Sequence, residues 1–215
     1  MTERPQHGSA RPGGRTARTR AAVLAAALHE LDETGFGGLT LDKLASRSGV
    51  HVSTIRRRWR SVEGVVVDLM AQHSKTIATP DSGEFRQDLY ELAEAIAGFH
   101  AQPRSRNLVE AMVAAAAYDP HIADLVRSAF VARTDVVTAL VHRAVERGEV
   151  PPDTDAYEVI AALSAPFYYR LLIMRGSIDE RLVRASAEAA YQAARGGVFG
   201  GAEVEEEAEA EEAAG

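Results

Sequence analysis

Residues 40–60, TLDKLASRSGVHVSTIRRRWR, constrain the fold more than any other stretch of this chain. They predict two short helices joined at Gly49, because glycine readily adopts the left-handed backbone that ends a helix. The side of the second helix that faces a core carries Val52, Ile55 and Trp59. Arginines and small hydroxyl residues occupy the other side. This pattern is typical of a helix that enters the DNA major groove, and the alternative is an ordinary amphipathic helix with a solvated basic face.

Guanidinium groups suit phosphates and guanine edges, and small side chains permit close approach to the bases. We therefore expect groove contacts from Thr54, Arg56 and Arg57, with Val52 and Ser53 at the start of the helix. The helical periodicity turns Val52 towards the core, which weakens its assignment. The expected phosphate contacts are Thr40, Arg58 and Arg60. Arg15 and Arg18, at the basic N-terminal end, are expected to reach along the DNA backbone or into a minor groove.

The run from Arg15 to Met70 resembles the DNA-binding region of TetR-family transcriptional regulators. The residues that carry this resemblance are Gly35-Phe36, Leu39-Thr40, Leu44-Ala45, Gly49-Val50, Thr54-Ile55, Trp59, Ser61 and Glu63. The chain departs from the family pattern at His51 (usually Ser), Arg56 (usually Tyr) and Val62 (usually a phosphate-contacting Lys). Arg56 and Arg58 are the candidates to replace the missing phosphate contact.

The charge is distributed unevenly along the chain, whose net charge is −7. Residues 1–60 contain 11 Lys/Arg against 5 Asp/Glu, whereas residues 201–215 contain seven Glu and no base. Phosphate binding responds to the local field, so a basic head on an acidic body remains compatible with DNA binding.

We expect disorder in the arm 1–14 and in the acidic tail 198–215. The tail is either a solvated spacer or a competitor of DNA for the basic head.

The absence of cysteine excludes disulfides and argues against a structural zinc site. No apolar stretch is long enough to span a membrane, and the basic N-terminal residues lack an apolar signal core, so we expect a cytoplasmic protein. The chain also lacks the sequence motifs of common enzymes, including GxSxG, the P-loop, HExxH and GxGxxG. The sequence therefore predicts neither an enzyme nor a cofactor.

Apolar residues at helical spacing continue from Ser61 to Arg195 and predict an all-α fold. The expected helices run from Ser61 to about Ile77, from Phe85 to just before Pro103, around 108–117, from Pro120 to Gly148, from about 153 to 174 and from 179 to 195. We expect a three-helix DNA-binding domain with a helix-turn-helix at 15–61 and a larger helical domain at 62–197. Pro166 should kink the helix that contains it.

The run ALVHRAVERGEVPPDTDAYEVIAALSAPFYYRLLI resembles the C-terminal ligand-binding domain of one branch of the TetR family. The resemblance implies a homodimer in which the last two helices of each copy form a four-helix bundle. The residues expected in that interface are Leu163, Phe167, Leu171, Ala187, Ala190 and Ala194. The alternative is that these apolar residues complete the core of a single chain.

The resemblance also implies a cavity for an unknown small-molecule effector, whose binding shifts helix 61–77. The candidate lining residues are Met70, His73, Phe99, His100, Met112, Tyr118, Phe130, Tyr168 and Tyr169, any of which is otherwise plain core. This lining suits an apolar or aromatic effector. We expect no metal site at the histidines. The sequence thus predicts a homodimeric regulator, a repressor by family habit, that binds palindromic double-stranded DNA. The alternative is a helical ligand sensor or interaction protein that retains the fold without specific DNA binding.

Overall fold

The computed structural model describes residues 14–75 and 77–200, and its regular structure in these ranges is helical apart from one isolated β-bridge between Thr154 and Gly200. The predicted all-α class is therefore confirmed. The chain divides into two compact units, Met1–Leu69 and Met70–Gly215. None of the described helices combines the length and apolar character that a membrane crossing requires. Most of the predicted basic arm and acidic tail falls outside the described residues.

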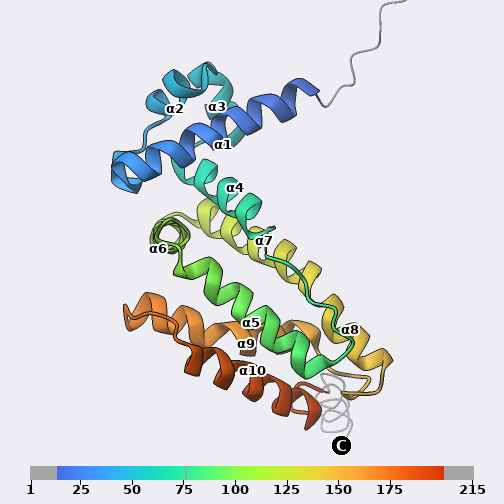
Figure 1. The fold of residues 1–215 in the computed structure, drawn as a ribbon. Helices are drawn as coiled ribbons and strands as arrows, with labels where there is room; N and C mark the ends of the chain where they lie inside the picture. The colour runs from blue at the N-terminus through green and yellow to red at the C-terminus, as the bar shows by residue number, and fades with distance from the viewer. Residues whose placement is uncertain (1–13, 76, 201–215) are drawn as a thin grey trace, which may run out of the picture. The chain divides into compact units, whose positions relative to one another are not determined.

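The first unit contains a long helix followed by a helix-turn-helix (Figure 1). Its elements are α1 (Gly14–Thr34), the 3-10 turn η1 (Phe36–Gly38), α2 (Leu41–Ser48), α3 (Val52–Trp59) and the first part of α4 (Val62–Ser74). Helix α2 packs against both α1 and α3. Fully buried Val23, Ala27, Leu44 and Ile55 form the centre of this small core.

Local sequence explains where α2 begins and ends. The Thr40 hydroxyl oxygen accepts a hydrogen bond from the Lys43 amide at 3.2 Å, which satisfies one of the free N–H groups of the first turn. At the other end Gly49 has φ 69°, the left-handed conformation that glycine adopts at little cost. The turn between the two helices therefore forms as the sequence predicted.

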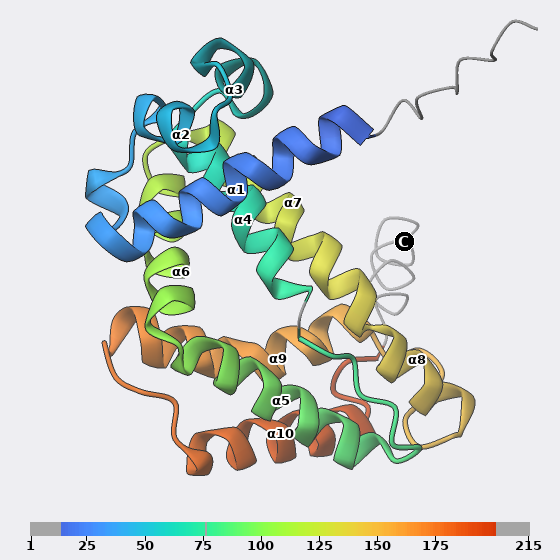
Figure 2. The same ribbon diagram turned by 45° about the horizontal axis from the view of Figure 1, so that its top comes forward.

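The second unit is a larger helical bundle (Figures 1 and 2). Its elements after α4 are α5 (Phe85–Ala101), α6 (Pro103–Ala116), α7 (Pro120–Val137), α8 (Ala139–Glu146), α9 (Ala156–Tyr168), the π-helix η2 (Tyr169–Ile173) and α10 (Glu180–Arg195). Helix α10 packs against α5 and α9, and α6 packs against α7. The core between α5, α8, α9 and α10 includes fully buried Phe85, Leu89, Leu140 and Leu163.

Several boundaries differ from the prediction. The expected helix from Pro120 to Gly148 is split at Thr138, whose hydroxyl donates to the Asp135 carbonyl at 2.9 Å and competes with the helical backbone pattern. Helix α9 begins at Ala156 because Asp155 caps it, accepting from the amides of residues 157 and 158. The preceding prolines belong to the loop. Residues 198–200, assigned to the tail, stay ordered because the Asp155 amide donates to the Phe199 carbonyl at 2.7 Å.

Pro166 lies inside α9, where it has no amide hydrogen to donate. The helix continues through it and widens into η2 directly afterwards. Tyr168 and Tyr169 mark the transition, and their exposure differs: Tyr168 is half-buried and Tyr169 is 58% exposed. The proline thus coincides with a local change of helical pitch.

The prediction of the dimer interface requires correction. The six residues named for it are Leu163, Phe167, Leu171, Ala187, Ala190 and Ala194, and all are at most 4% exposed in the single chain. They fill the protomer's own core between α5, α9 and α10, with Leu171 buried in η2. Side chains that are already covered offer almost no area to a second copy. The alternative stated for them, the core of one chain, is what the structure shows.

Candidate nucleic-acid interface

Helix α3 has a buried side and a cationic exposed side. Ile55 and Trp59 point into the first unit and are 0% and 6% exposed. The exposed cations of the helix and its C-cap, here called the α3 arginines, are Arg56, Arg57, Arg58 and Arg60. Of the shorter side chains named for the groove, Ser53 is exposed, whereas Val52 and Thr54 are half-buried. The helix and its C-cap therefore offer four guanidinium groups and one exposed hydroxyl to solvent.

A carboxylate within the unit fixes the orientation of α3. The Trp59 indole Nε1 donates to Asp68 Oδ2 at 2.8 Å, and Arg20 donates to the same carboxylate through Nε at 3.0 Å and Nη2 at 2.6 Å. Burial raises the pKa of Asp68, but the hydrogen bonds from Arg20 and Trp59 together outweigh it and hold this pKa below its ordinary value. Asp68 is thus ionised at neutral pH and ties α1, α3 and α4 together.

The turn from α3 into α4 is equally tight. A Cβ at Gly64 would lie 2.2 Å from the Trp59 carbonyl oxygen, so no larger residue fits there without a backbone shift. Asp68 and this contact explain why the first compact unit extends to Leu69, eight residues beyond the predicted domain end at 61. Helical periodicity did not indicate this boundary, because Arg20, one partner of Asp68, lies 48 residues away along the chain.

The bases of α2 are engaged within the unit. Arg47 donates to Glu30 Oε1 and Glu33 Oε2, both at 2.6 Å, and these hydrogen bonds raise its pKa. Lys43 Nζ donates to the Gly38 carbonyl at 2.7 Å. In contrast, none of the α3 arginines forms an ion pair with a residue in the described ranges 14–75 and 77–200. Their charges therefore remain available to an anionic partner.

The other predicted DNA contacts lie at helix starts. Arg15 and Arg18 are exposed in the first turns of α1, where Arg18 Nε donates to the Gly14 carbonyl at 3.1 Å. Thr40 is exposed, and its side-chain oxygen is engaged as the cap of α2. Arg58 lies over the Trp59 ring with its guanidinium carbon 5.1 Å from the ring centroid. This contact restricts Arg58 more than its neighbours.

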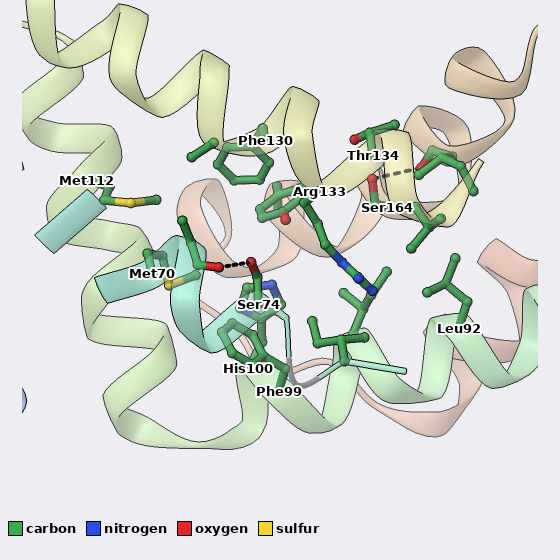
Figure 3. Close-up of a pocket in the computed structure, with 17 residues that line it drawn as sticks. Met70, Ser74, Leu92, Phe99, His100, Met112, Phe130, Arg133, Thr134 and Ser164 are labelled. Carbon is green, nitrogen blue, oxygen red and sulfur yellow. Dashed lines mark hydrogen bonds between the residues drawn. The ribbon is translucent and has the colours of Figure 1, made fainter. Parts of the chain in front are cut away.

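A separate cavity of about 100 Å³ lies within the second unit (Figure 3). It is lined by Met70, Ala71, Ser74, Ile77, Leu92, Ile96, Phe99, His100, Met112, Ala129, Phe130, Arg133, Thr134, Val137, Ile160, Ser164 and Tyr168. Of the residues that the sequence proposed for an effector, six belong to this set: Met70, Phe99, His100, Met112, Phe130 and Tyr168. His73, Tyr118 and Tyr169 do not line it. Tyr118 is 91% exposed in the turn between α6 and α7. Tyr169 is the residue after Tyr168, and its side chain is exposed to solvent rather than directed into the cavity.

The aromatic side chains of the cavity form a chain of edge-to-face contacts. His100 lies 5.2 Å from Phe99 and 5.5 Å from Tyr168 between ring centroids, and Tyr168 lies 5.8 Å from Phe130. Burial lowers the pKa of His100 to about 4 and raises the pKa of Tyr168 to about 12. Both groups are therefore uncharged at neutral pH. Neither acts as a charged partner for a ligand under these conditions.

Sequence reasoning missed the cation of this cavity, Arg133. A signal was present, because Arg133 lies three residues after Phe130 and four before Val137, on the apolar face of α7. An arginine at such a position interrupts a core stripe. Among the described residues, the cavity included, no group of three or more His, Asp or Glu side chains is arranged to hold a metal ion.

Comparisons with known proteins cover both units. A family model described as "Bacterial regulatory proteins, tetR family" matches residues 23–69, and one described as "Tetracyclin repressor-like, C-terminal domain" matches residues 79–190. The second match alone spans more than half of the chain. The first ends at Leu69, where the compact unit ends.

Similar individual proteins carry related descriptions. The chain is 29% identical over 168 residues to an uncharacterized HTH-type transcriptional regulator, YdeS, of Bacillus subtilis (strain 168), covering 77% of this chain and 84% of that one. It is 29% identical over 165 residues to the HTH-type transcriptional regulator AqdR of Rhodococcus erythropolis, covering 76% and 78%. Among solved structures, the TetR family transcription regulator SCO0332 superposes with a TM-score of 0.72 at 26% identity, covering 81% of this chain and 97% of that one.

Proposed function

The chain belongs to the TetR family of transcriptional regulators, and from this premise we propose that its α3 arginines read a palindromic operator in double-stranded DNA. As a member of that family it is a DNA-binding regulator. The observation that carries the proposal is that Arg56 and Arg57 on α3, and Arg60 at its C-cap, form no ion pair with any described residue, while the Trp59–Asp68 hydrogen bond holds the helix in place. The proposal assigns the chain no catalytic reaction, and it places the protein in the cytoplasm with the DNA.

The α3 arginines divide into two roles in this proposal. Arg56 and Arg57, with Ser53 and Thr54, enter the major groove and contact base edges. Arg58 and Arg60 contact phosphates, as do Thr40, Arg15 and Arg18 at the starts of α2 and α1. Val52 is half-buried, so its contribution is limited to apolar contact with a thymine methyl. Arg47 and Lys43 take no part, because their charges are engaged within the unit.

The active species in our proposal is a homodimer, because two reading helices related by a twofold axis match a palindrome. An apolar stripe exposed along α9 and η2 supports this idea. It comprises Tyr157, Ala161, Ala165, Tyr169 and Ile173, at intervals of about one helical turn. We call these five residues the α9 stripe. It replaces the six buried residues as the proposed contact between copies, with exposed Ala185 and Ala189 of α10 as further candidates.

Regulation is proposed to act through the cavity of the second unit. An effector that binds there and favours a conformation with weaker DNA affinity releases the operator, which makes the protein a repressor in its ligand-free form. Helix α4 is the continuous segment that joins the two units along the chain: its residues up to Leu69 belong to the first, and Met70, Ala71 and Ser74 line the cavity. Because α4 is continuous, a ligand that moves its cavity-lining residues also acts on the part of the helix that belongs to the DNA-binding unit.

Selection of bound duplexes from a random DNA pool tests the proposal, performed with the full chain at low and at physiological salt. We expect an inverted repeat whose half-sites are centred about one DNA turn, ~10 base pairs, or a multiple of it apart. A variant in which Arg56 and Arg57 are both replaced by Ala serves as the comparison and should not enrich the repeat. If the wild-type chain binds DNA without enriching any sequence, or does not bind at low salt, the proposal fails and the ligand-sensor alternative gains support.

A further inference from the structure

Arg133 is the cation of a mainly apolar cavity, and no carboxylate of the described residues forms an ion pair with it. Its Nη2 atom is buried and has no hydrogen-bond partner among the described residues. Figure 3 shows the side chain extending from α7 into the space that Phe130, Thr134 and Leu92 surround. Burial lowers the pKa of Arg133, but a guanidinium remains charged in proteins under all ordinary conditions. The cavity therefore holds a permanent positive charge.

No described residue of the cavity lining neutralises this charge. The lining set contains no Asp or Glu. Other arginines of the same unit find carboxylates: Arg106 and Arg175 both contact Glu110, at 3.1 and 2.9 Å, and Arg143 contacts Asp81 at 3.0 Å. A partly buried cation without a partner lacks the attraction that usually offsets its lost hydration. An anion that enters the cavity would restore that attraction.

The remaining polar groups narrow the chemistry of such an anion. Ser74 and Ser164 already donate their hydroxyl hydrogens to the carbonyls of residues 71 and 160, at 3.2 and 2.9 Å. The donors left for a ligand are Arg133, the Thr134 hydroxyl and the neutral side chains of Tyr168 and His100. The Nδ1 atom of His100 has no partner in the described structure. One guanidinium fork matches one carboxylate, whereas a phosphate dianion would keep one charge uncompensated. The site thus suits a single negative charge.

The rest of the lining specifies the body of the ligand. Phe99, Phe130 and Met112 contribute aromatic and thioether surface, and Ile160 and Val137 add aliphatic surface. The cavity volume of about 100 Å³ is somewhat below the ~150 Å³ of an apolar cavity that admits benzene. A body of about one ring, or a short alkyl chain, is therefore the largest that we expect to bind, and a full ring requires the lining side chains to move.

We propose that this cavity binds a small monocarboxylate with an aromatic or short aliphatic body, and that its carboxylate pairs with Arg133. This inference rests on the proposed role of the cavity as an effector site and specifies the effector's class. Arg133 supplies the charge, and Tyr168 and His100 supply neutral hydrogen bonds beside it. The apolar side chains from α5, α6, α7 and α9 exclude water from the body of the ligand.

Isothermal titration of the full chain at pH 7 tests the inference, with benzoate and hexanoate as probes and benzamide and hexanamide as neutral counterparts. We expect at least one acid to bind more tightly than its amide by roughly tenfold to a hundredfold, the range for a charge-assisted hydrogen bond. Arg133→Met should remove that preference, whereas Arg133→Lys should retain part of it. Arg127→Met is the matched control, because Arg127 is an exposed arginine on the same helix.

Thermal unfolding of each variant shows whether a loss of binding results merely from a loss of folding. Arg133→Met removes an uncompensated cation, so it should unfold at the same or a higher temperature than the wild type. The inference is overturned if neither acid binds at millimolar concentration, if the amides bind as tightly as the acids, or if folded Arg133→Met binds the acids unchanged. Because no DNA is present, these outcomes are independent of the duplex selection: a failed selection with acid binding intact refutes only the regulator proposal.

Discussion

Asp68 is the residue on which the geometry of the DNA-binding unit depends most. It accepts hydrogen bonds from Trp59 on α3 and Arg20 on α1, and about a quarter of its side chain is exposed. It contacts no DNA in the proposal and acts through the helices it holds. Changes at Asp68 should therefore affect stability and DNA affinity together, in contrast to changes at the α3 arginines.

We predict that Asp68→Asn destabilises the first unit by about 1–2 kcal/mol, because it weakens the charge-assisted hydrogen bonds that the partly exposed Asp68 carboxylate accepts from Arg20 and Trp59. Thermal denaturation followed by Trp59 fluorescence measures the effect, since the chain has a single tryptophan. Asp42→Asn, which changes an exposed carboxylate at the start of α2, is the control. Equal stability of Asp68→Asn and wild type would show that the carboxylate does not hold α3.

His100 gives the second unit a defined pH dependence. Burial lowers its pKa to about 4, whereas the unfolded chain binds this proton near pH 6.5. As the pH falls below 6.5, the unfolded state gains a proton that the folded state does not, so stability decreases until the folded pKa is reached. A shift of this size corresponds to roughly 3 kcal/mol.

The corresponding prediction concerns His100→Gln. Between pH 7 and pH 4 the free energy of unfolding should fall in both proteins, but the fall should be smaller in His100→Gln. The difference between the two falls should be roughly 3 kcal/mol. Urea denaturation at a series of pH values provides the measurement, and His142→Gln, at an exposed histidine of the same unit, provides the comparison. Parallel pH profiles for wild type and His100→Gln would mean that the buried ring is not neutral in the folded protein.

At the scale of elements, the helix-turn-helix depends on the turn at Gly49. Its φ of 69° suits glycine, and a Cβ there would meet no atom within 4 Å. Backbone strain alone therefore sets the cost of Gly49→Ala, which we predict at about 1–2 kcal/mol. Gly37→Ala is a matched control, because Gly37 has equally open surroundings and no positive φ. Thermal unfolding should rank Gly49→Ala below Gly37→Ala, and the reverse order would contradict the account.

The elements that local chemistry controls could be predicted from the sequence. Thr40, Gly49 and Asp179 set helix ends through their own hydrogen bonds or backbone conformation, and the predicted ends agree with the structure there. Contacts that join distant segments could not be predicted. The Asp68 cluster and the order of residues 198–200 depend on partners 48 and about 45 residues away, which periodicity does not identify.

For the candidate sites too, features set by local sequence could be predicted, and contacts between distant segments could not. Exposure of the α3 arginines follows from helical spacing within one short helix, so the sequence located them. Periodicity also marked Leu163 and Phe167 as the apolar face of α9, but it does not tell whether the covering helix belongs to the same chain or to a second copy. The structure shows that α5 and α10 of the same chain cover them. The sequence candidates for the cavity were chosen among Met, His and aromatic residues, so Arg133, which lies on the same face of α7, was missed.

At the scale of the whole molecule, the proposed dimer requires the α9 stripe. Tyr169 and Ile173 are 58% and 68% exposed, which is unusual for large apolar side chains. We predict that Tyr169→Glu shifts the protein to a monomer, because a charge buried between copies is costly without a partner. Sedimentation velocity reports the change. Tyr118→Glu, at a tyrosine that is 91% exposed elsewhere in the unit, should leave the dimer intact.

Loss of the dimer should also reduce operator affinity, since each copy then contacts only one half-site. The proposed arrangement is contradicted if Tyr169→Glu remains dimeric, or if Tyr118→Glu dissociates the protein instead. A wild-type chain that is monomeric at micromolar concentration would remove the α9 stripe as a contact surface altogether.

The central claim is that α3 reads base sequence through Arg57 while Arg58 contacts phosphate. The most direct test compares dissociation constants for the selected duplex and a scrambled duplex over a range of salt concentrations. Arg57→Ala should cost about 1–3 kcal/mol on the selected duplex and reduce the preference for it over the scrambled one. Arg58→Ala should weaken both duplexes alike and lower the slope of log K against log salt by about 1. If both variants bind both duplexes as the wild type does, α3 is not the reading helix.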